Sequence, residues 1–288
     1  MKPNHPIKQL PYFLLSEPEL SPVEGIQLVV SDLDGTLLNP EHKLTEHTIK
    51  TIQALVKQGV QFMLATGRHY QDVYLFAEQI GVDMCLITSN GARVHNHHGV
   101  LLYENHIPDI LVKRVLELSQ GFDIHRNLYQ QDLWLVEEPH ESLLAIHEVS
   151  GFEYKLRDFS QIDLNHIDKI YFTAPHDVLM ALEKTLSVEL GGQLAITFTS
   201  PEYLEVMNIG VSKGKALQMI MQNRGLAAEQ VMALGDGMND KEMLALVGHG
   251  VVMENASDSV KSLFPDLPQA KSNANNGVAE YLRAHLFR

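Results

Sequence analysis

The chain has 288 residues, of which 45% are hydrophobic and 20% are charged, which is the balance of a folded protein long enough for two modest domains. Its net charge of −14 argues against nucleic acid or an anionic membrane surface as a partner, because either would need a basic face. The charge is compatible with an anionic small substrate, since a divalent cation reverses the local sign of a site. Cys85 is the only cysteine, so a disulfide framework is excluded, and its apolar neighbours predict a core position.

The first 25 residues differ in composition from the rest of the chain. They contain five prolines and lack the apolar segment of a signal peptide. No stretch of the sequence reaches the ~18–20 apolar residues of a membrane span. We therefore expect residues 1–25 to be an N-terminal extension of the fold and the protein to be cytoplasmic.

From residue 26 onward, short apolar runs alternate with amphipathic segments. The runs rich in Val, Ile and Leu are typical of strands that are buried on both faces of a parallel sheet, and they occupy residues 26–32, 60–66 and 84–89. Helices are predicted between them over 45–59, with Thr45 as the N-cap and Gly59 as the stop, and over 69–81. This alternation predicts right-handed crossovers and a Rossmann-like, doubly wound α/β sheet.

The pattern changes after the third predicted strand. Residues 92–104 are predicted to form a hairpin around a turn at 97–99. We assign the histidine-rich stretch 95–98 to that polar turn rather than to a zinc site, because no cysteine or carboxylate adjoins it in the sequence. Residues 107–199 mix antiparallel strands with amphipathic helices, which predicts an α+β cap inserted into the core, whose first part is 26–106.

The alternating pattern is predicted to return in the second part of the core, 200–288. After an apolar run at 203–208, a helix is expected over 212–225, with Ser212 as its N-cap. The elements expected next are a strand over 230–236, a helix over 238–248 and a strand over 250–253.

Polar side chains follow four of the predicted strands, directly or after a short turn. They are Asp32 and Asp34, then Thr66, Gly67 and Arg68, then Lys213, and finally Asp236, Asn239 and Asp240. Ligands of open α/β sheets bind beyond the carboxyl ends of the strands, so we expect these residues to meet at one edge. Alone, each is explained by a turn, a helix cap or a solvated charge. Together they supply carboxylates, a hydroxyl group and a cation.

These residues stand in motifs that resemble the haloacid dehalogenase-like phosphatases, and within them the Cof-type branch, which carries a C2-type cap. The motifs are DLDGTLL at 32–38, ATGR at 65–68, GVSKGKAL at 210–217 and GDGMNDKEM at 235–243, with TSNGA at 88–92, VVMENA at 251–256 and NNGVAEYL at 275–282. The resemblance covers the chain from residue 26 onward. The extension has no counterpart, and Glu254 stands where a small residue is common.

The resemblance implies a Mg²⁺-dependent phosphatase with an aspartyl-phosphate intermediate. Asp32 would be the nucleophile, Asp34 the general acid and then the general base, and Asp240 the partner of Lys213. Mg²⁺ would be held by the carboxylates of Asp32 and Asp236 and by the backbone carbonyl of Asp34. The phosphoryl oxygens would be contacted by the amides of Leu33 and Gly67 and by the side chains of Thr66, Asn239 and Lys213.

The expected substrate is a small phosphorylated metabolite, with pyridoxal 5′-phosphate or sugar phosphates implied by the resemblance. Candidate contacts are Arg68, Asn90 and Arg93 in the core and Arg126, Tyr129 and Trp134 in the cap. A monomer or homodimer is expected. Two alternatives stay open: a phosphotransferase or mutase that uses the same aspartyl-phosphate, and an inactive module that binds phosphorylated metabolites.

Overall fold

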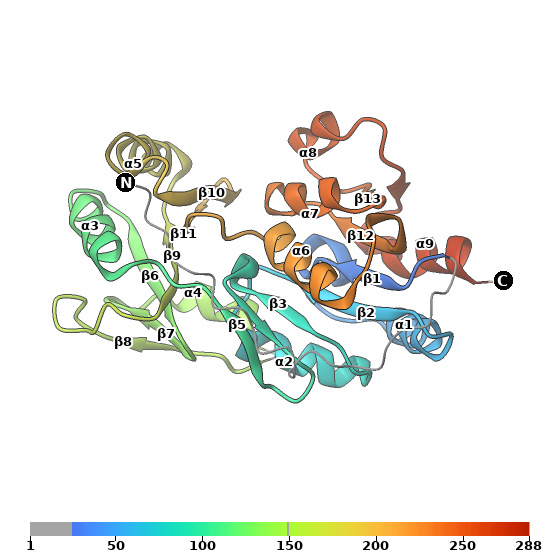
Figure 1. The fold of residues 1–288 in the computed structure, drawn as a ribbon. Helices are drawn as coiled ribbons and strands as arrows, with labels where there is room; N and C mark the ends of the chain where they lie inside the picture. The colour runs from blue at the N-terminus through green and yellow to red at the C-terminus, as the bar shows by residue number, and fades with distance from the viewer. Residues whose placement is uncertain (1–24, 149, 288) are drawn as a thin grey trace.

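A computed structural model describes residues 25–148 and 150–287. The extension predicted for residues 1–25 therefore lies outside the described residues, apart from Gly25. Two β-sheets lie side by side, each with its own helices (Figure 1). Over the described ranges, no helix is both long enough and apolar enough to cross a membrane.

The larger sheet has eight strands in the order β14-β13-β12-β1-β2-β3-β4-β5. Their bounds are β1 Leu28–Ser31, β2 Gln61–Ala65, β3 Leu86–Thr88, β4 Arg93–His95, β5 Leu101–Glu104, β12 Val231–Gly235, β13 His249–Met253 and β14 Gln269–Ala270. The strands from β14 to β3 are parallel, whereas β4 and β5 are antiparallel. The predicted doubly wound α/β class is confirmed.

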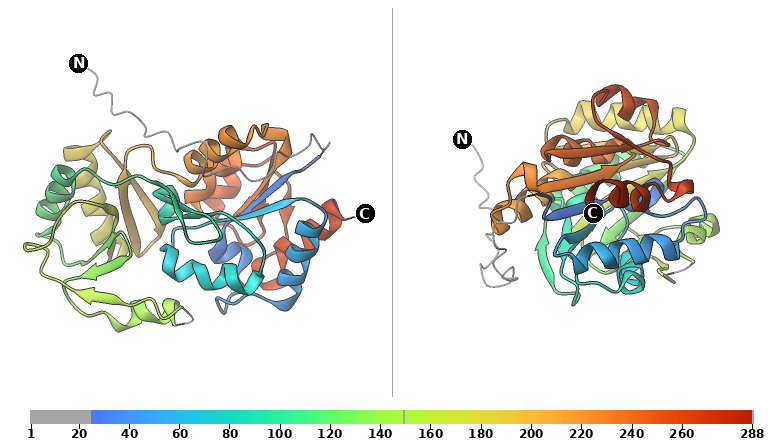
Figure 2. Two further views of the ribbon diagram at one scale, coloured as in Figure 1. Left: turned by 60° about the horizontal axis from the view of Figure 1, so that its bottom comes forward. Right: turned by 90° about the vertical axis from the view of Figure 1, so that its right-hand side faces the viewer.

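Helices cover both faces of this sheet (Figure 2). One face carries α1 Glu46–Lys57, α2 Tyr70–Ile80 and α9 Gly277–Leu286; the other carries α6 Lys213–Arg224, α7 Lys241–Leu246 and α8 Asp258–Leu263. Side chains of β1 alternate between the two layers, since Val29 packs with the first set and Val30 with the second. Both predicted N-caps are confirmed, because the side chains of Thr45 and Ser212 accept from Thr48 and Lys215 amides.

The predicted hairpin is formed by β4 and β5. Gly99 N donates to Asn96 O across 3.0 Å within the turn, and His95 is buried against the ring of Tyr70. The sequence places no carboxylate beside this turn, but the fold brings Asp83 there, with its Oδ1 atom 3.4 Å from His97 Nε2. Asp83 is remote in the sequence and reaches the hairpin only through the fold.

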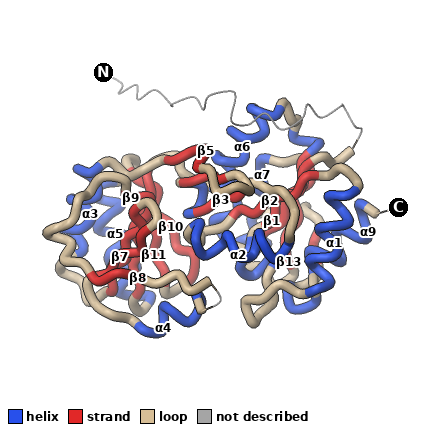
Figure 3. Tube along the Cα trace, turned by 90° about the horizontal axis from the view of Figure 1, so that it is seen from below, coloured by secondary structure: helices blue, strands red, loops and turns tan. Residues whose placement is uncertain are grey.

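The smaller sheet has six strands in the order β10-β11-β9-β6-β7-β8. Their bounds are β6 His125–Gln130, β7 Leu133–Val136, β8 Tyr154–Leu156, β9 Ile167–Thr173, β10 Leu194–Ser200 and β11 Tyr203–Asn208. Helices α3 Asp109–Ser119 and α5 His176–Leu190 pack on one face, and the short helix α4 Glu141–Leu144 lies at the other (Figure 3).

The smaller sheet continues past the boundary that we predicted at 199/200. The run 203–208 was expected to lead back into the core, but as β11 it pairs antiparallel with β9 and β10. A central strand is apolar in either kind of sheet, so the sequence does not distinguish the two locations. Lys213 therefore follows the linker 209–212 rather than a strand of the larger sheet.

The chain crosses between the sheets twice. It leaves after β5 and returns after β11, and Asn208 Nδ2 donates to Asn105 Oδ1 across 2.7 Å. The two crossings are therefore adjacent.

Candidate active site

The end of β1 brings Asp32 to the carboxyl edge of the larger sheet. The next residues form the turn Leu33–Leu37, in which Gly35 has a φ of 76°. A Cβ on Gly35 would collide with the Asp236 carboxylate, so the close approach of these two segments requires glycine. Thr36 Oγ1 then donates to Asp236 Oδ1 across 2.7 Å. The DLDGTLL and GDGMNDKEM motifs are thus joined by a hydrogen bond.

Lys213, in the first turn of α6, connects two more of the predicted residues. Its ammonium group donates to Asp32 Oδ1 across 2.5 Å and to Asp240 Oδ1 across 2.7 Å, and its side chain is fully buried. The other oxygen of Asp240 accepts from the amides of Asp236, at 3.0 Å, and Gly237, at 2.9 Å. Asp240 is therefore held at both oxygens, which fixes the position of the Lys213 ammonium.

The site contains more buried negative than positive charge. Carboxylate oxygens of Asp32, Asp236 and Asp240 lie within 4.8 Å of one another. Burial and the charges of Asp240 and Asp236 raise the pKa of Asp32, and Lys213 offsets them only in part. Burial and Asp240 likewise raise the pKa of Asp236 to about 6. A divalent cation would relieve this repulsion, and an all-oxygen donor set suits Mg²⁺.

Asp34 is engaged by Arg68 and His42 in this structure. Arg68 donates to its two carboxylate oxygens from Nε at 2.7 Å and Nη2 at 2.5 Å, and His42 Nδ1 lies 3.2 Å from Oδ1. Burial opposes ionisation of Asp34, but the hydrogen bonds of His42 and Arg68 outweigh it and hold its pKa below the usual range. His42 was missed by sequence reasoning, because it lies in the loop before α1 and belongs to no motif.

A cavity of about 370 Å³ lies at the end of β1 and is bordered on its other side by residues of the smaller sheet and its α4 segment. From the core, Thr66, Gly67 and Asn239 line it along with Asp32, Asp34 and Asp236, whereas Lys213 and Asp240 are buried beneath. Thr66 Oγ1 accepts from the amide of Arg68 at 3.1 Å. The Leu33 side chain is buried in the core, so only its backbone is suited to the predicted phosphate contact.

The cap contributes a polar and aromatic wall to this cavity. Lys169 Nζ donates to Glu205 Oε1 and to the carbonyl of Gly67, both across 2.8 Å. The same ammonium lies 4.8 Å from the ring centre of Tyr129 and 5.2 Å from that of Tyr171. Tyr171 stacks on Tyr203, with ring centres 6.2 Å apart. Except for Tyr129, these residues were missed, because they alternate within ordinary strands and carry no motif.

Most of the other predicted contacts lie away from the cavity. Trp134 is fully buried in the cap and donates to Asn127 Oδ1, while Arg126 pairs with Glu137. Arg93 Nη1 donates to Asp132 Oδ1 across 3.0 Å, in the turn between β6 and β7. Asn90 accepts from Asn239 Nδ2 across 2.9 Å and donates to Glu205, so it links core and cap.

The family model of haloacid dehalogenase-like hydrolases matches residues 29–282. This chain belongs to that family. A haloacid dehalogenase-like hydrolase from Bacteroides thetaiotaomicron has a similar structure, with a TM-score of 0.79, 26% identity and coverage of 90% of this chain and 99% of that one. The predicted Cof-type branch is confirmed.

Curated relatives align with this chain over nearly nine-tenths of its length. An HMP-PP phosphatase of Serratia proteamaculans is 36% identical over 258 residues, which are 89% of this chain and 94% of that protein. An HMP-PP phosphatase of Cronobacter sakazakii is 36% identical over 251 residues, 87% of this chain and 92% of that protein. The predicted enzyme class, a phosphoric monoester hydrolase of this family, is confirmed.

Proposed function

We propose that this haloacid dehalogenase-like hydrolase is a Mg²⁺-dependent phosphatase that cleaves small phosphorylated metabolites through an aspartyl-phosphate on Asp32. The observation that carries the proposal is the buried Asp32–Lys213–Asp240 array beside Asp236 at the carboxyl edge of the sheet. Hydrolysis of phosphate monoesters is extremely slow without a catalyst, so the site must mainly neutralise charge and position the reactants.

Asp32 attacks phosphorus through a carboxylate oxygen, and the bond to the leaving oxygen breaks. Lys213 keeps Asp32 in place and presents positive charge toward the phosphoryl oxygens, because burial opposes its charge but Asp240 and Asp32 raise its pKa above the ordinary value. Thr66, Gly67 and Asn239, which line the same cavity, donate to those oxygens. When bound, Mg²⁺ neutralises charge between the carboxylates and the phosphoryl group.

The two proton transfers of Asp34 place different demands on its surroundings. Paired with Arg68 and His42, Asp34 is a carboxylate and is suited to take a proton from the water that cleaves the aspartyl-phosphate. To protonate the leaving oxygen it must first separate from Arg68. An incoming phosphoryl dianion competes for that guanidinium group, and loss of the ion pair leaves burial to favour the protonated acid.

We further propose that the substrate carries a flat aromatic ring. Tyr129, Tyr171 and Tyr203 line the cavity beside Lys169 and Glu205, which would provide a donor and an acceptor for ring substituents. These features favour pyridoxal 5′-phosphate over sugar phosphates. HMP-PP, from the names of the relatives, is a second substrate to test.

The catalytic proposal is tested by phosphate release with Mg²⁺ and with EDTA, for wild type, Asp32→Asn and the exposed control Asp258→Asn. We expect activity only with Mg²⁺, at background in Asp32→Asn and near wild type in the control. Substantial turnover by folded Asp32→Asn protein would remove Asp32 as nucleophile. A phosphorylated product that depends on an acceptor would indicate a phosphotransferase instead.

The substrate proposal is tested with Tyr203→Ala, since Tyr203 is only partly buried, and with Tyr74→Ala on α2 as the matched control. Loss of one aromatic contact of about 1.4 kcal/mol lowers kcat/KM for pyridoxal 5′-phosphate about tenfold. We expect a much smaller effect on a sugar phosphate. Equal losses on both substrates would contradict recognition of an aromatic ring.

A further inference from the structure

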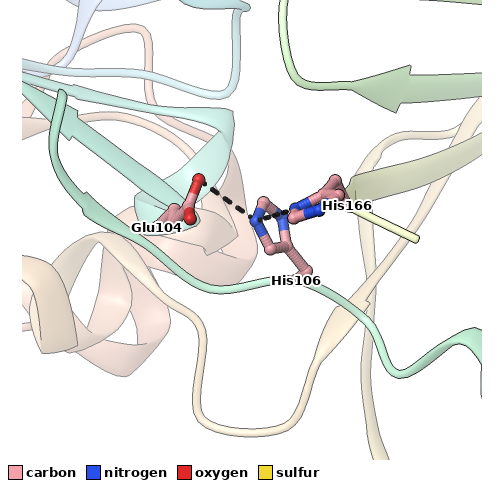
Figure 4. A group of neighbouring side chains, drawn as sticks. All are labelled: Glu104, His106 and His166. Carbon is pink, nitrogen blue, oxygen red and sulfur yellow. Dashed lines mark hydrogen bonds and ion pairs between the residues drawn. The ribbon is translucent and has the colours of Figure 1, made fainter. Parts of the chain in front are cut away.

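A second group of side chains of the types that bind metals lies at the junction of the two sheets, apart from the catalytic cavity. It consists of Glu104, His106 and His166, whose ligand atoms all lie within 4.8 Å of one another. Figure 4 shows the ring of His106 between the other two side chains. Glu104 ends β5 of the larger sheet, and His166 immediately precedes β9 of the smaller one. The group therefore spans core and cap.

Backbone pairing sets the two histidines beside each other. Ile107, next to His106, forms an antiparallel bridge with Ile167, next to His166, and donates to its carbonyl across 2.8 Å. The two imidazoles are therefore close to each other because the backbone bridge between Ile107 and Ile167 holds their residues side by side.

Two of the three separations between ligand atoms are close to those of a tetrahedral metal site. His106 Nε2 lies 3.2 Å from Glu104 Oε2 and 3.2 Å from His166 Nδ1. Ligand atoms about 2.0–2.1 Å from a tetrahedral zinc ion are separated from one another by roughly 3.3–3.4 Å. Two of the three pairs are therefore already at the separation that a common ion would require.

The far side of His106 has the support expected of a metal ligand. His106 Nδ1 lies 2.8 Å from Oδ1 of Asp168, a carboxylate with no exposed surface. Donation from Nδ1 to Asp168 leaves the Nε2 lone pair directed at Glu104 and His166. The rival arrangement is a protonated His106 between two carboxylates; burial opposes that charge, but Asp168 and Glu104 raise the His106 pKa.

We propose that Glu104, His106 and His166 bind one transition-metal ion of the Zn²⁺ class, with Asp168 as the residue that positions His106. Two imidazole nitrogens and one carboxylate suit Zn²⁺ and its neighbours rather than Mg²⁺. Glu104 and His166 are exposed, so the ion can enter and solvent can complete its coordination. The ion would fasten the cap to the core beside the two chain crossings, which is a function separate from phosphate hydrolysis.

The site is tested on the full chain, stripped of metal and then held in saturating Mg²⁺. Zn²⁺ binding is measured by calorimetry, and the coordination by the visible spectrum of Co²⁺. We expect one tight Zn²⁺ per chain in wild type and in the control His176→Gln, whose histidine is also exposed on the cap. His166→Gln and His106→Gln should lose this site, and Asp168→Asn should bind about 10–100-fold more weakly.

Two results would overturn the site. One is the absence of a Zn²⁺ equivalent in wild type, which would favour the protonated His106; the other is unchanged binding in His166→Gln. His166 is exposed, so this variant should fold and keep its Mg²⁺-dependent phosphatase activity even if His106→Gln does not fold. Tetrahedral Co²⁺ absorption in wild type but not in His166→Gln would support the proposed ligands.

Discussion

Replacement of Lys213 by methionine tests the charge balance of the active site. The Lys213 ammonium is fully buried between Asp32 and Asp240, so water cannot take its place when it is removed. Breaking a buried ion pair from one side costs about 3–5 kcal/mol, because the remaining charge is left without a partner. For a protein of this size we expect a fall in Tm of roughly 6–20 °C.

The control lies two residues away on the same helix. Lys215 is exposed, and its ammonium contacts only Gln218 Oε1, at 3.3 Å, among the side-chain contacts described here. Lys215→Met should change the free energy of unfolding by no more than about 0.5 kcal/mol. Scanning calorimetry without Mg²⁺ measures both variants, and phosphate release with Mg²⁺ should be at background for Lys213→Met alone.

A second substitution separates charge from packing. Asp240→Asn, added to Lys213→Met, removes one unpartnered carboxylate while keeping an acceptor for the amides of Asp236 and Gly237. If excess charge causes the loss, the double variant should be more stable than Lys213→Met. The reasoning is refuted if Lys213→Met loses less than about 1 kcal/mol, or if the double variant is no more stable than the single one.

Three further outcomes are expected. Mg²⁺ at about 100 times its Kd should stabilise the protein by about 2.7 kcal/mol and raise Tm by roughly 5–10 °C. Either EDTA or the substitution Asp236→Asn should abolish this rise in Tm. An equal rise in the Asp236→Asn variant would place the ion elsewhere. Gly91→Ala should lower the free energy of unfolding by several kcal/mol, because the φ of Gly91 is 98° and the new methyl group would collide with the Ser212 carbonyl. The control Gly59→Ala has a similar φ of 89° but open space around it, so it should lower the free energy of unfolding by only about 1 kcal/mol. Similar losses in the two variants, measured by thermal unfolding, would exclude the collision as the cause. Burial lowers the pKa of His69 to about 4, so its proton is bound in the unfolded chain between pH 4 and 6.5 and not in the folded one. The free energy of unfolding should therefore rise across that interval, by up to roughly 3 kcal/mol, and NMR titration of the imidazole near 6.5 would contradict this.

The core side of the site was predictable because its residues follow strands. The parallel sheet brings the carboxyl ends of β1, β2 and β12 together, so Asp32, Thr66 and Asp236 had to converge once those strands were recognised. The rule accounts less well for Lys213, which reaches the site from a linker that follows a strand of the cap. Lys213 was predicted at this edge on the premise that the strand before it, 203–208, belongs to the larger sheet, and that strand is β11 of the smaller one.

The cap side was not predictable in the same way. Lys169 and Tyr171 lie within one strand, and the alternation of a strand does not reveal which face meets the cavity. Glu205 reaches the cavity only because β11 pairs with β9, a pairing between segments that the sequence placed in different domains. Likewise, Asp34 was predicted as the general acid, and only the structure shows that Arg68 and His42 contact its carboxylate.

The adjacent chain crossings at Asn105 and Asn208 separate the segments that carry the proposed catalytic residues from the segment that carries the proposed substrate contacts. The residues proposed for chemistry lie before and after the inserted segment, whereas most residues proposed to recognise the substrate ring lie within it. An insertion whose two ends meet can lengthen, shrink or be exchanged with little effect on closure of the surrounding domain. New specificities can therefore evolve in this architecture while the reaction itself stays the same.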